Sequence, residues 1–127
     1  MAKPIYVLVA DLFFAMKIVK TAEGLGLEAR AFDSSERLLQ ALEEKEPTLM
    51  ILDCEGLERE AFRLLERFQS DPKLSGIPRV GYLSHRAQEL KREMLQAGCE
   101  QVYAKSEFTK ELESLLTRYT NDFSSRI

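Results

Sequence analysis

Two aspartates stand where apolar segments of the sequence end. Asp11 follows the apolar run of residues 6–10, and Asp53 follows the run of residues 48–52. Short runs this apolar are typical of parallel strands that are covered on both faces. In parallel α/β sheets the site lies at the carboxyl ends of the strands. We therefore expect the two carboxylates to lie side by side at one edge of a sheet.

Two further segments with strand character also end in polar residues. Residues 79–83 are followed by Ser84, and residues 101–104 are followed by Lys105. The same edge of the sheet would then present two carboxylates, a hydroxyl and an ammonium group. The sequence therefore predicts four side chains of chemical interest at one place, each from a different strand end.

Segments with helical periodicity lie between these strands. Apolar residues recur at helical spacing in residues 12–23 and 57–69, and in three segments that begin after Asp33, Ser84 and Lys105. Asp33, Ser84 and Ser106 are placed to cap these three helices. Five strands alternating with five helices predict a doubly wound parallel α/β sheet. Residues 28–32 and 101–104 are the shorter, more polar strands, so we expect them at the edges of the sheet.

Length and composition fit one soluble domain. A chain of 127 residues buries roughly two-thirds of its unfolded surface and needs no metal or disulfide to fold. We expect a single domain over residues 1–127, with a core in residues 4–119 and a frayed polar tail in residues 120–127. The net charge of −3 argues against a nucleic-acid partner, because phosphate binding needs a concentrated basic surface.

Cysteine usage and hydropathy indicate a cytoplasmic protein. Cys54 and Cys99 have neither metal-site nor framework spacing, so we expect reduced thiols. The longest apolar run, residues 5–10, is far too short to cross a bilayer. The first residues lack the apolar core and cleavage site of a signal peptide. We therefore expect no membrane association.

With these elements in place, the chain resembles the receiver domain of bacterial two-component response regulators, in an atypical or pseudo-receiver form. The resemblance covers residues 4 to about 119 and implies a flavodoxin-like (CheY-like) sheet in the order 2-1-3-4-5. By the motifs of that family, Asp53 matches the phospho-acceptor. Asp11 matches the second member of the acidic pair that binds a divalent metal, Ser84 the conserved hydroxyl residue, and Lys105 the conserved lysine.

The resemblance implies a definite chemistry for these four residues. The Asp53 carboxylate would attack a phosphoryl group and become an acyl phosphate. Magnesium would be held weakly by Asp11 and Asp53 and would offset charge on the phosphoryl oxygens. Lys105 would neutralise one oxygen, and the Ser84 hydroxyl would donate a hydrogen bond to another.

The sequence also departs from the family pattern around this site. The usual Met-Pro and Asp-Gly pairs are absent from residues 54–61, where Glu55 is placed to return a carboxylate to the rim. Four further positions differ: Ala10 replaces an acid, His85 a small residue, Val102 the switch aromatic and Ser106 a proline. These changes affect metal binding, access and signal readout. We interpret the chain as a receiver with a degenerate acidic site, acting through protein–protein interaction and not as an enzyme.

Other functions are compatible with the same residues. One alternative is a pseudo-receiver adaptor that binds partners without phosphorylation. A flavodoxin-like flavin carrier or enzyme is a weaker alternative, because residues 12–15 are apolar where a flavin phosphate needs a polar loop. The acids themselves have a structural interpretation: Asp11 and Asp53 would only cap helices, and Lys105 would only pair with Asp53.

The expected partner is a protein, either a histidine kinase or a downstream signalling protein, and the chain is expected to be a monomer or weak dimer. The resemblance implies that the partner binds the face built by residues 87–97, 101–104 and the last helix. Phe13 marks a second candidate surface, because it lies on the side of its helix opposite Ile18 and Ala22.

Overall fold

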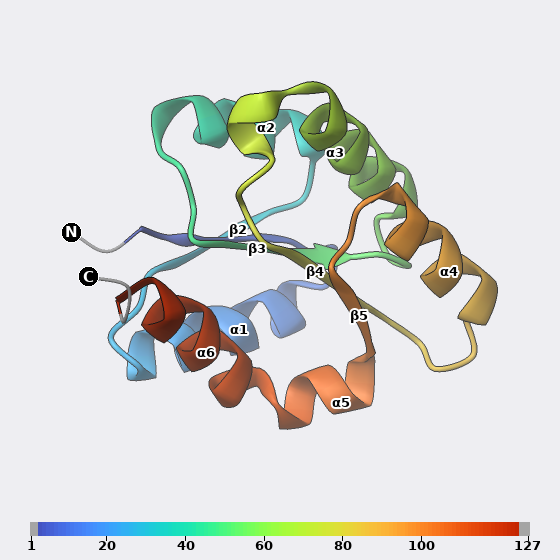
Figure 1. Cartoon of the computed structure of the whole chain (residues 1–127). Helices are drawn as coiled ribbons and strands as arrows, with labels where there is room; N and C mark the ends of the chain where they lie inside the picture. The colour runs from blue at the N-terminus through green and yellow to red at the C-terminus, as the bar shows by residue number, and fades with distance from the viewer. Residues whose placement is uncertain (1–2, 125–127) are drawn as a thin grey trace.

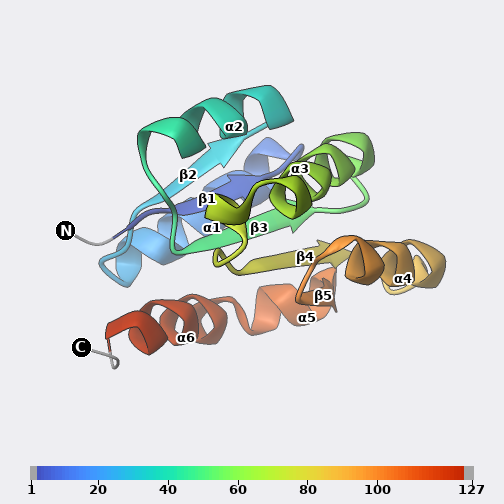
Figure 2. The ribbon, with the colours of Figure 1, turned by 45° about the horizontal axis from the view of Figure 1, so that its top comes forward.

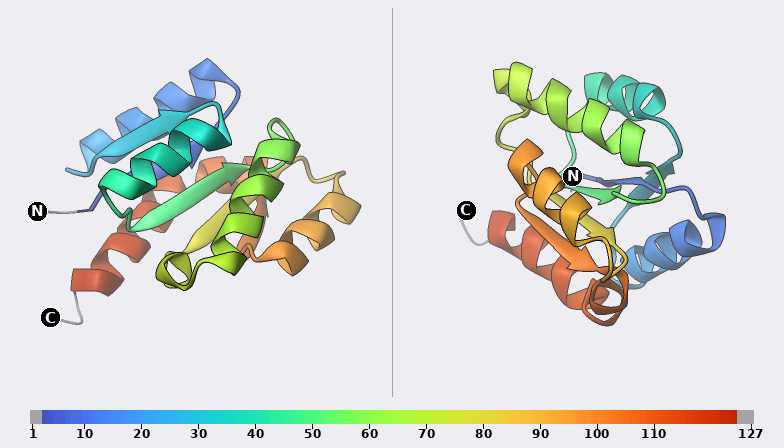
Figure 3. Two further views of the ribbon diagram at one scale, coloured as in Figure 1. Left: turned by 90° about the horizontal axis from the view of Figure 1, so that it is seen from above. Right: turned by 90° about the vertical axis from the view of Figure 1, so that its right-hand side faces the viewer.

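The five strands form one parallel sheet in the order β2-β1-β3-β4-β5. The computed structural model describes residues 3–124. The strands are β1 (Ile5–Leu8), β2 (Ala29–Phe32), β3 (Leu49–Asp53), β4 (Arg79–Leu83) and β5 (Gln101–Ala104). Both expected edge strands, β2 and β5, lie at the edges, so the predicted flavodoxin-like order is confirmed. The strands are parallel, so their carboxyl ends lie together at one end of the sheet (Figure 3).

Helices cover both faces of the sheet (Figures 1 and 2). One face, which we call the α1 face, carries α1 (Leu12–Gly24), α5 (Lys105–Lys110) and α6 (Leu112–Ser124). The opposite face, the α3 face, carries α2 (Ser35–Glu44), α3 (Glu58–Ser70) and α4 (Gln88–Ala97). A short 3-10 helix, η1 (Pro72–Leu74), follows α3. In the described residues, no helix is long and apolar enough to span a membrane.

Strand alternation divides the buried residues into two clusters. On β1, Ile5 and Val7 pack against α1 and α6, whereas Tyr6 and Leu8 pack against α2 and α3. Successive side chains of a strand point to opposite faces, and all four residues of β1 are buried. A continuous apolar strand therefore needs helices on both sides, as the sequence predicted.

The last helix corrects one expectation. Residues 3–124 contain six α-helices instead of the expected five, because the predicted final helix divides into α5 and α6 at Glu111. The two pieces change direction (Figure 1), and each contributes to the core of the α1 face, with Phe108 from α5 and Leu112 from α6. Ser106 does not cap this helix, because α5 already begins at Lys105, with Ala104 at the N-cap.

Other boundaries shift by a few residues. β1 ends at Leu8, so Asp11 lies in the following loop and not at the strand end itself. Ser34, not Asp33, caps α2: its side chain accepts from the N–H of Arg37. Residues 120–124, expected in the frayed tail, continue α6, and residues 125–127 lie outside the described residues.

Candidate functional site

Asp53 is the last residue of β3, and its carboxylate is held by backbone from two loops. Its Oδ1 accepts from the Gly56 N–H at 2.8 Å, and its Oδ2 accepts from the Ala10 N–H at 3.4 Å. The residue is only 8% exposed. A Cβ at Gly56 would overlap Oδ2 and stand 2.8 Å from Oδ1. Only glycine therefore allows the loop after β3 to lie this close to the acceptor position.

Asp11 has the role of a helix cap in this structure. Its Oδ1 accepts from the N–H groups of Phe13 at 2.8 Å and Phe14 at 3.2 Å, which are free donors at the start of α1. The side chain is exposed. The hydrogen bond from Ala10 to Asp53 joins the loop of Asp11 to the carboxylate of Asp53. Asp11 and Asp53 therefore lie at the carboxyl-terminal side of β1 and β3, a region that we call the acidic edge. Each of the two acids already bonds to backbone N–H groups.

Ser84 and Glu55 connect the loops after β4 and β3. Glu55 Oε1 accepts from the Ser84 N–H at 2.9 Å, so Glu55 returns a carboxylate to the rim as the sequence predicted. The Ser84 hydroxyl accepts from the Arg86 N–H at 3.1 Å. It does not cap α4, whose N-cap is Ala87 without a side-chain bond, because the turn of residues 84–87 uses this hydroxyl. His85 is exposed beside it.

Lys105 lies over an aromatic ring. Its Nζ is 4.5 Å from the ring centroid of Phe14, a distance typical of a cation–π contact. In the part of the chain that the structure describes, Lys105 forms no ion pair with Asp53. The alternative in which Lys105 pairs with Asp53 is therefore wrong for this structure. The physical reason is that backbone donors already bond to Asp53, while the Phe14 ring offers its negative face to the ammonium group.

Tyr82 is a residue of this site that the sequence interpretation missed. It is paired with Asp53 across β3 and β4, and its ring packs 5.1 Å from Phe14 and 4.9 Å from Phe108, centroid to centroid. Its hydroxyl is buried and has no hydrogen-bond partner among the described residues. Burial, and then the charge of Asp53, raise the pKa of Tyr82. Strand alternation offered a signal, since Tyr82 lies two residues before Ser84.

Comparisons with known proteins agree with this geometry. No family model matches the sequence, and no curated protein matches it. Solved structures do match. The receiver domain of the sensor histidine kinase PA1611 from Pseudomonas aeruginosa, with a magnesium ion coordinated in its active site cleft, superposes with a TM-score of 0.79 at 17% identity, over 95% of this chain and 99% of that chain.

Two further structures show the same arrangement. The receiver domain of NtrX from Brucella abortus matches with a TM-score of 0.77 at 18% identity, over 92% of this chain and 98% of that chain. The Mn²⁺-bound form of the response regulator Rcp1 matches with a TM-score of 0.77 at 12% identity, over 93% and 94% of the two chains. The fold is that of a response regulator receiver domain.

Within this receiver fold, the positions that depart from the family pattern differ in exposure. Val102, at the position of the switch aromatic, is 6% exposed and belongs to the core of the α3 face. Ala10, His85 and Ser106 are exposed. The switch position is therefore filled by a buried aliphatic side chain, while the other three departures lie at the surface of the acidic edge.

The acidic edge of this receiver fold offers few metal ligands. Among the described residues, no group of three or more His, Cys, Asp or Glu side chains is arranged to hold a metal ion. The two carboxylates of Asp11, in the loop after β1, and Asp53, at the end of β3, remain. Mg²⁺ in proteins commonly uses one or two carboxylates and keeps several waters, so the residues present fit a weak site and not a strong one.

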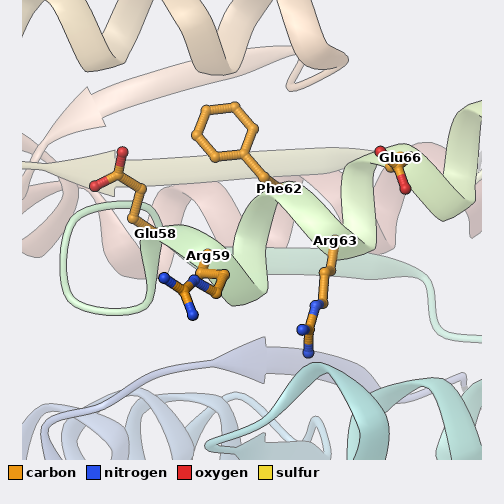
Figure 4. A pocket seen from close by; sticks show the side chains of 5 residues that line it. All are labelled: Glu58, Arg59, Phe62, Arg63 and Glu66. Atoms are coloured by element: carbon orange, nitrogen blue, oxygen red, sulfur yellow. The ribbon is translucent and has the colours of Figure 1, made fainter.

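The described residues form several hollows, and one of them adjoins the loop of Ala10. A first hollow, of about 600 Å³, lies on the outer side of α3, around the ring of Phe62 and between acidic and basic side chains (Figure 4). Its lining residues are Glu58, Arg59, Phe62, Arg63 and Glu66, all from one helix and none from the acidic site. Another, of about 460 Å³, lies between α1 and β2 and includes Ala10 and Leu12. The second hollow therefore opens where the family pattern has an acid.

Proposed function

We propose that this chain is a receiver-like module of two-component signalling that acts by binding a protein partner and not as an enzyme. One observation carries the proposal: both oxygens of Asp53 accept hydrogen bonds from backbone, and Lys105 lies over Phe14 instead of pairing with Asp53. A site in this state is not poised for phosphoryl transfer. Partner binding therefore depends little on phosphorylation, and the module works in the cytoplasm as one domain.

Phosphorylation of Asp53 is slow or absent in this proposal. Attack on a phosphoryl group needs an accessible carboxylate oxygen, and Asp53 is only 8% exposed, with one backbone hydrogen bond to each oxygen. Moving the Asp53 carboxylate toward a phosphodonor would disturb its two backbone hydrogen bonds, at about 0.5–1.5 kcal/mol for each bond lost.

Magnesium binds weakly in this proposal. The PA1611 and Rcp1 structures contain Mg²⁺ and Mn²⁺, respectively. In this chain Asp11 and Asp53 would hold the ion, and the ion when bound would supply positive charge toward phosphoryl oxygens. Ala10 removes the third acid, and the hydrogen bonds to Asp11 and Asp53 compete with metal ligation. We therefore expect an affinity well below that of a site with three acids.

The partner surface includes the exposed start of α1. Leu12, Phe13 and Met16 are 71%, 84% and 46% exposed, whereas the face of α4, β5 and α5 exposes Leu95 at 40%. Lys17 and Lys20 follow on the exposed side of α1. An exposed apolar cluster beside a functional edge is typical of a protein contact. We assign this surface to a histidine kinase or a downstream signalling protein.

Intact-mass spectrometry tests the proposal. The chain is incubated with acetyl phosphate or phosphoramidate and Mg²⁺, with Asp53→Asn as the control. We expect little or no added phosphate. A rapid, stoichiometric gain of one phosphate that Asp53→Asn abolishes would contradict the proposal and support an ordinary phosphorylation-driven receiver.

A double variant sharpens the same test. Ala10→Asp restores a metal ligand, and His85→Ala restores a small residue beside Ser84. Together they should increase the phosphate gained by Asp53. If the double variant gains no more phosphate than the unchanged chain, then residues 10 and 85 are not the cause of the degenerate behaviour.

A further inference from the structure

The two cysteines of the chain meet inside the core of the α3 face. A Cβ added at Gly81 would overlap the Cys54 Sγ and lie 3.6 Å from the Cys99 Sγ, so both sulfurs border the same small space. The Cys54 thiol donates to the Leu52 carbonyl at 3.6 Å, and both thiols are free and buried. Their spacing in the sequence gave no indication of this contact. The fold therefore creates a thiol pair.

The pair connects two parts of the molecule that bear on the proposed function. Cys54 directly follows Asp53, and its N–H donates to the Tyr82 carbonyl at 3.1 Å. Cys99 lies between α4 and β5, and its N–H donates to the Met94 carbonyl at 3.1 Å. A covalent bond between the sulfurs would therefore join the strand of the acceptor position to the C-terminal end of α4.

α4 is held weakly compared with its neighbours. Met94 is the one buried side chain of α4, and the N-cap of this helix, like that of α3, makes no side-chain bond. α3 buries four side chains: Ala61, Leu64, Leu65 and Phe68. Elements with few buried contacts open locally at low free energy. Opening of α4 would expose Cys99, which is 5% exposed in the closed state, before Cys54, which is 0% exposed.

We propose that Cys54 and Cys99 are an oxidant-responsive pair that forms a reversible disulfide and then restrains α4 against the sheet. The oxidant class is a peroxide. The Cys99 thiolate attacks one peroxide oxygen; the S–O bond forms, the O–O bond breaks, and the second oxygen leaves as water after taking a proton. The Cys54 sulfur then attacks the sulfenic sulfur, and a second water leaves. Two thiols and one hydrogen peroxide give one disulfide and two waters.

The closed structure protects the pair from this reaction. Cys99, the thiol that attacks the peroxide, is only 5% exposed, and Cys54 is 0% exposed, so the peroxide has little access to either sulfur in the closed state. The interaction with Cys99, and then burial, raise the pKa of the Cys54 thiol, and a protonated thiol is a poor nucleophile toward the sulfenic sulfur. The reaction therefore proceeds from the state in which α4 is open, and its rate follows the population of that state. This proposal holds whether or not Asp53 accepts phosphate.

The first experiment measures disulfide formation. The reduced chain is treated with hydrogen peroxide under native conditions, denatured, alkylated and weighed. We expect a monomer that has lost about 2 Da, for two hydrogen atoms, that takes up no alkyl group, and that reverts with dithiothreitol. Cys54→Ala and Cys99→Ala should each block this product. Two alkylated thiols after native treatment, at peroxide levels that oxidise the unfolded chain, would overturn the proposal, as would disulfide-linked dimers.

The second experiment tests the route through α4. Met94→Ala removes the one buried anchor of α4 and should speed disulfide formation roughly tenfold or more, because the open state is more populated. Leu95→Ala, at an exposed position of the same helix, is the matched control and should leave the rate unchanged. Equal rates for Met94→Ala and Leu95→Ala would overturn the role of α4.

The third measurement tests the restraint. Hydrogen exchange of the amides in residues 88–97 should slow roughly tenfold in the oxidised chain, and dithiothreitol should reverse this. Exchange in α2 should not change and serves as the internal control. Unchanged or faster exchange in α4 of the oxidised chain would overturn the claim that the disulfide restrains this helix.

Discussion

Each face of the sheet buries a tyrosine, and the two tyrosines differ in whether the hydroxyl has a hydrogen-bond partner. On the α3 face, the hydroxyl of Tyr6 donates to the carbonyls of Lys45 at 2.8 Å and Ala41 at 3.2 Å. On the α1 face, Tyr82 is equally buried, and its hydroxyl has no partner among the described residues. A buried polar group without a partner costs about 1–3 kcal/mol. The core on the α1 face, beneath the acidic edge, therefore contains a buried hydroxyl without a hydrogen bond, whereas the tyrosine hydroxyl in the core of the α3 face is hydrogen-bonded.

The faces also differ in how they fill space. The α1 face stacks the rings of Phe14, Tyr82 and Phe108 beneath the edge. The α3 face instead packs two sulfurs against the bare backbone of Gly81. On the α1 face, the rings around Tyr82 offer no acceptor for its hydroxyl. On the α3 face, the two sulfurs fit only because Gly81 has no side chain. We therefore expect a different residue on each face to have the largest effect on the free energy of unfolding when it is substituted.

On the α3 face, the largest expected effect is at Gly81. Gly81→Ala places a methyl group onto the Cys54 sulfur and should lower the free energy of unfolding by about 1–3 kcal/mol, the usual cost of overpacking. Chemical denaturation measures the change. Cys54→Ala in the same chain should recover part of the loss, because it removes the overlapping atom.

The control for this prediction is Gly76→Ala, where an added Cβ meets nothing within 4 Å. It should change the stability by less than about 0.5 kcal/mol. If Gly81→Ala is as mild as Gly76→Ala, the packing of the α3 face around the cysteines is looser than described.

The two tyrosines give a direct test of the comparison. Tyr82→Phe removes a buried hydroxyl without a partner and should raise the free energy of unfolding by about 1 kcal/mol. Tyr6→Phe removes a hydroxyl that donates to two carbonyls and should lower it by about 1 kcal/mol. Changes of the same sign in the two variants would show that the faces do not differ in this way.

The pH dependence reports on the α3 face. Glu60 Oε1 accepts from the backbone N–H of Ser35 at 2.7 Å and from its hydroxyl at 2.9 Å, and these bonds lower the pKa of Glu60 below its ordinary value of 4.5. As the pH falls below 4.5, the unfolded chain binds this proton first, so stability is lost until the folded pKa is passed. The contribution is fully present above that window.

Glu60→Gln should therefore lower the stability at pH 7 by about 1 kcal/mol and flatten its decrease between pH 4.5 and lower values. Denaturation curves at several pH values measure both effects. Glu66→Gln, at an exposed position of the same helix, is the control and should change neither. An unchanged acid slope in Glu60→Gln would mean that other carboxylates cause the loss of stability.

The smallest expected effect is on the solvent side of the α1 face. Phe13 is 84% exposed, as the sequence predicted, so Phe13→Ser should change the free energy of unfolding by less than about 0.5 kcal/mol. Phe14→Ser, one residue further on and 8% exposed, should lower it by about 3–5 kcal/mol. A loss of several kcal/mol in Phe13→Ser would identify Phe13 as core and exclude it as a partner contact.

The pattern of apolar and polar residues along the chain predicted the architecture. Apolar runs of strand length, such as residues 48–52, and helical periodicity between them identified a doubly wound sheet, since a strand apolar throughout must be covered twice. The more polar pattern of β2 and β5 identified the edges. Residues 79–83 and 101–104 were predicted with the bounds that β4 and β5 have. These features depend on residues that are close together in the sequence, so the sequence alone predicts them.

Only the tertiary structure decided how the polar residues are used. Asp53 and Asp11 were located at the right edge, but backbone donors from Gly56, Ala10 and Phe13 determine what their oxygens bind. Pairing of strands, which no local pattern reveals, sets Tyr82 beside Asp53. Packing of α1 and α5 sets Lys105 over Phe14.

The thiol pair also results from packing between segments that are far apart in the sequence. Cys54 and Cys99 are distant in the sequence, and the crossover through β4 and α4 brings both sulfurs to Gly81. Hydrogen-bond partners and sulfur contacts act over a few ångströms between segments far apart in the chain. Residue types therefore indicated which groups meet at the sheet edge, and only the packed backbone determined which of them are free to react.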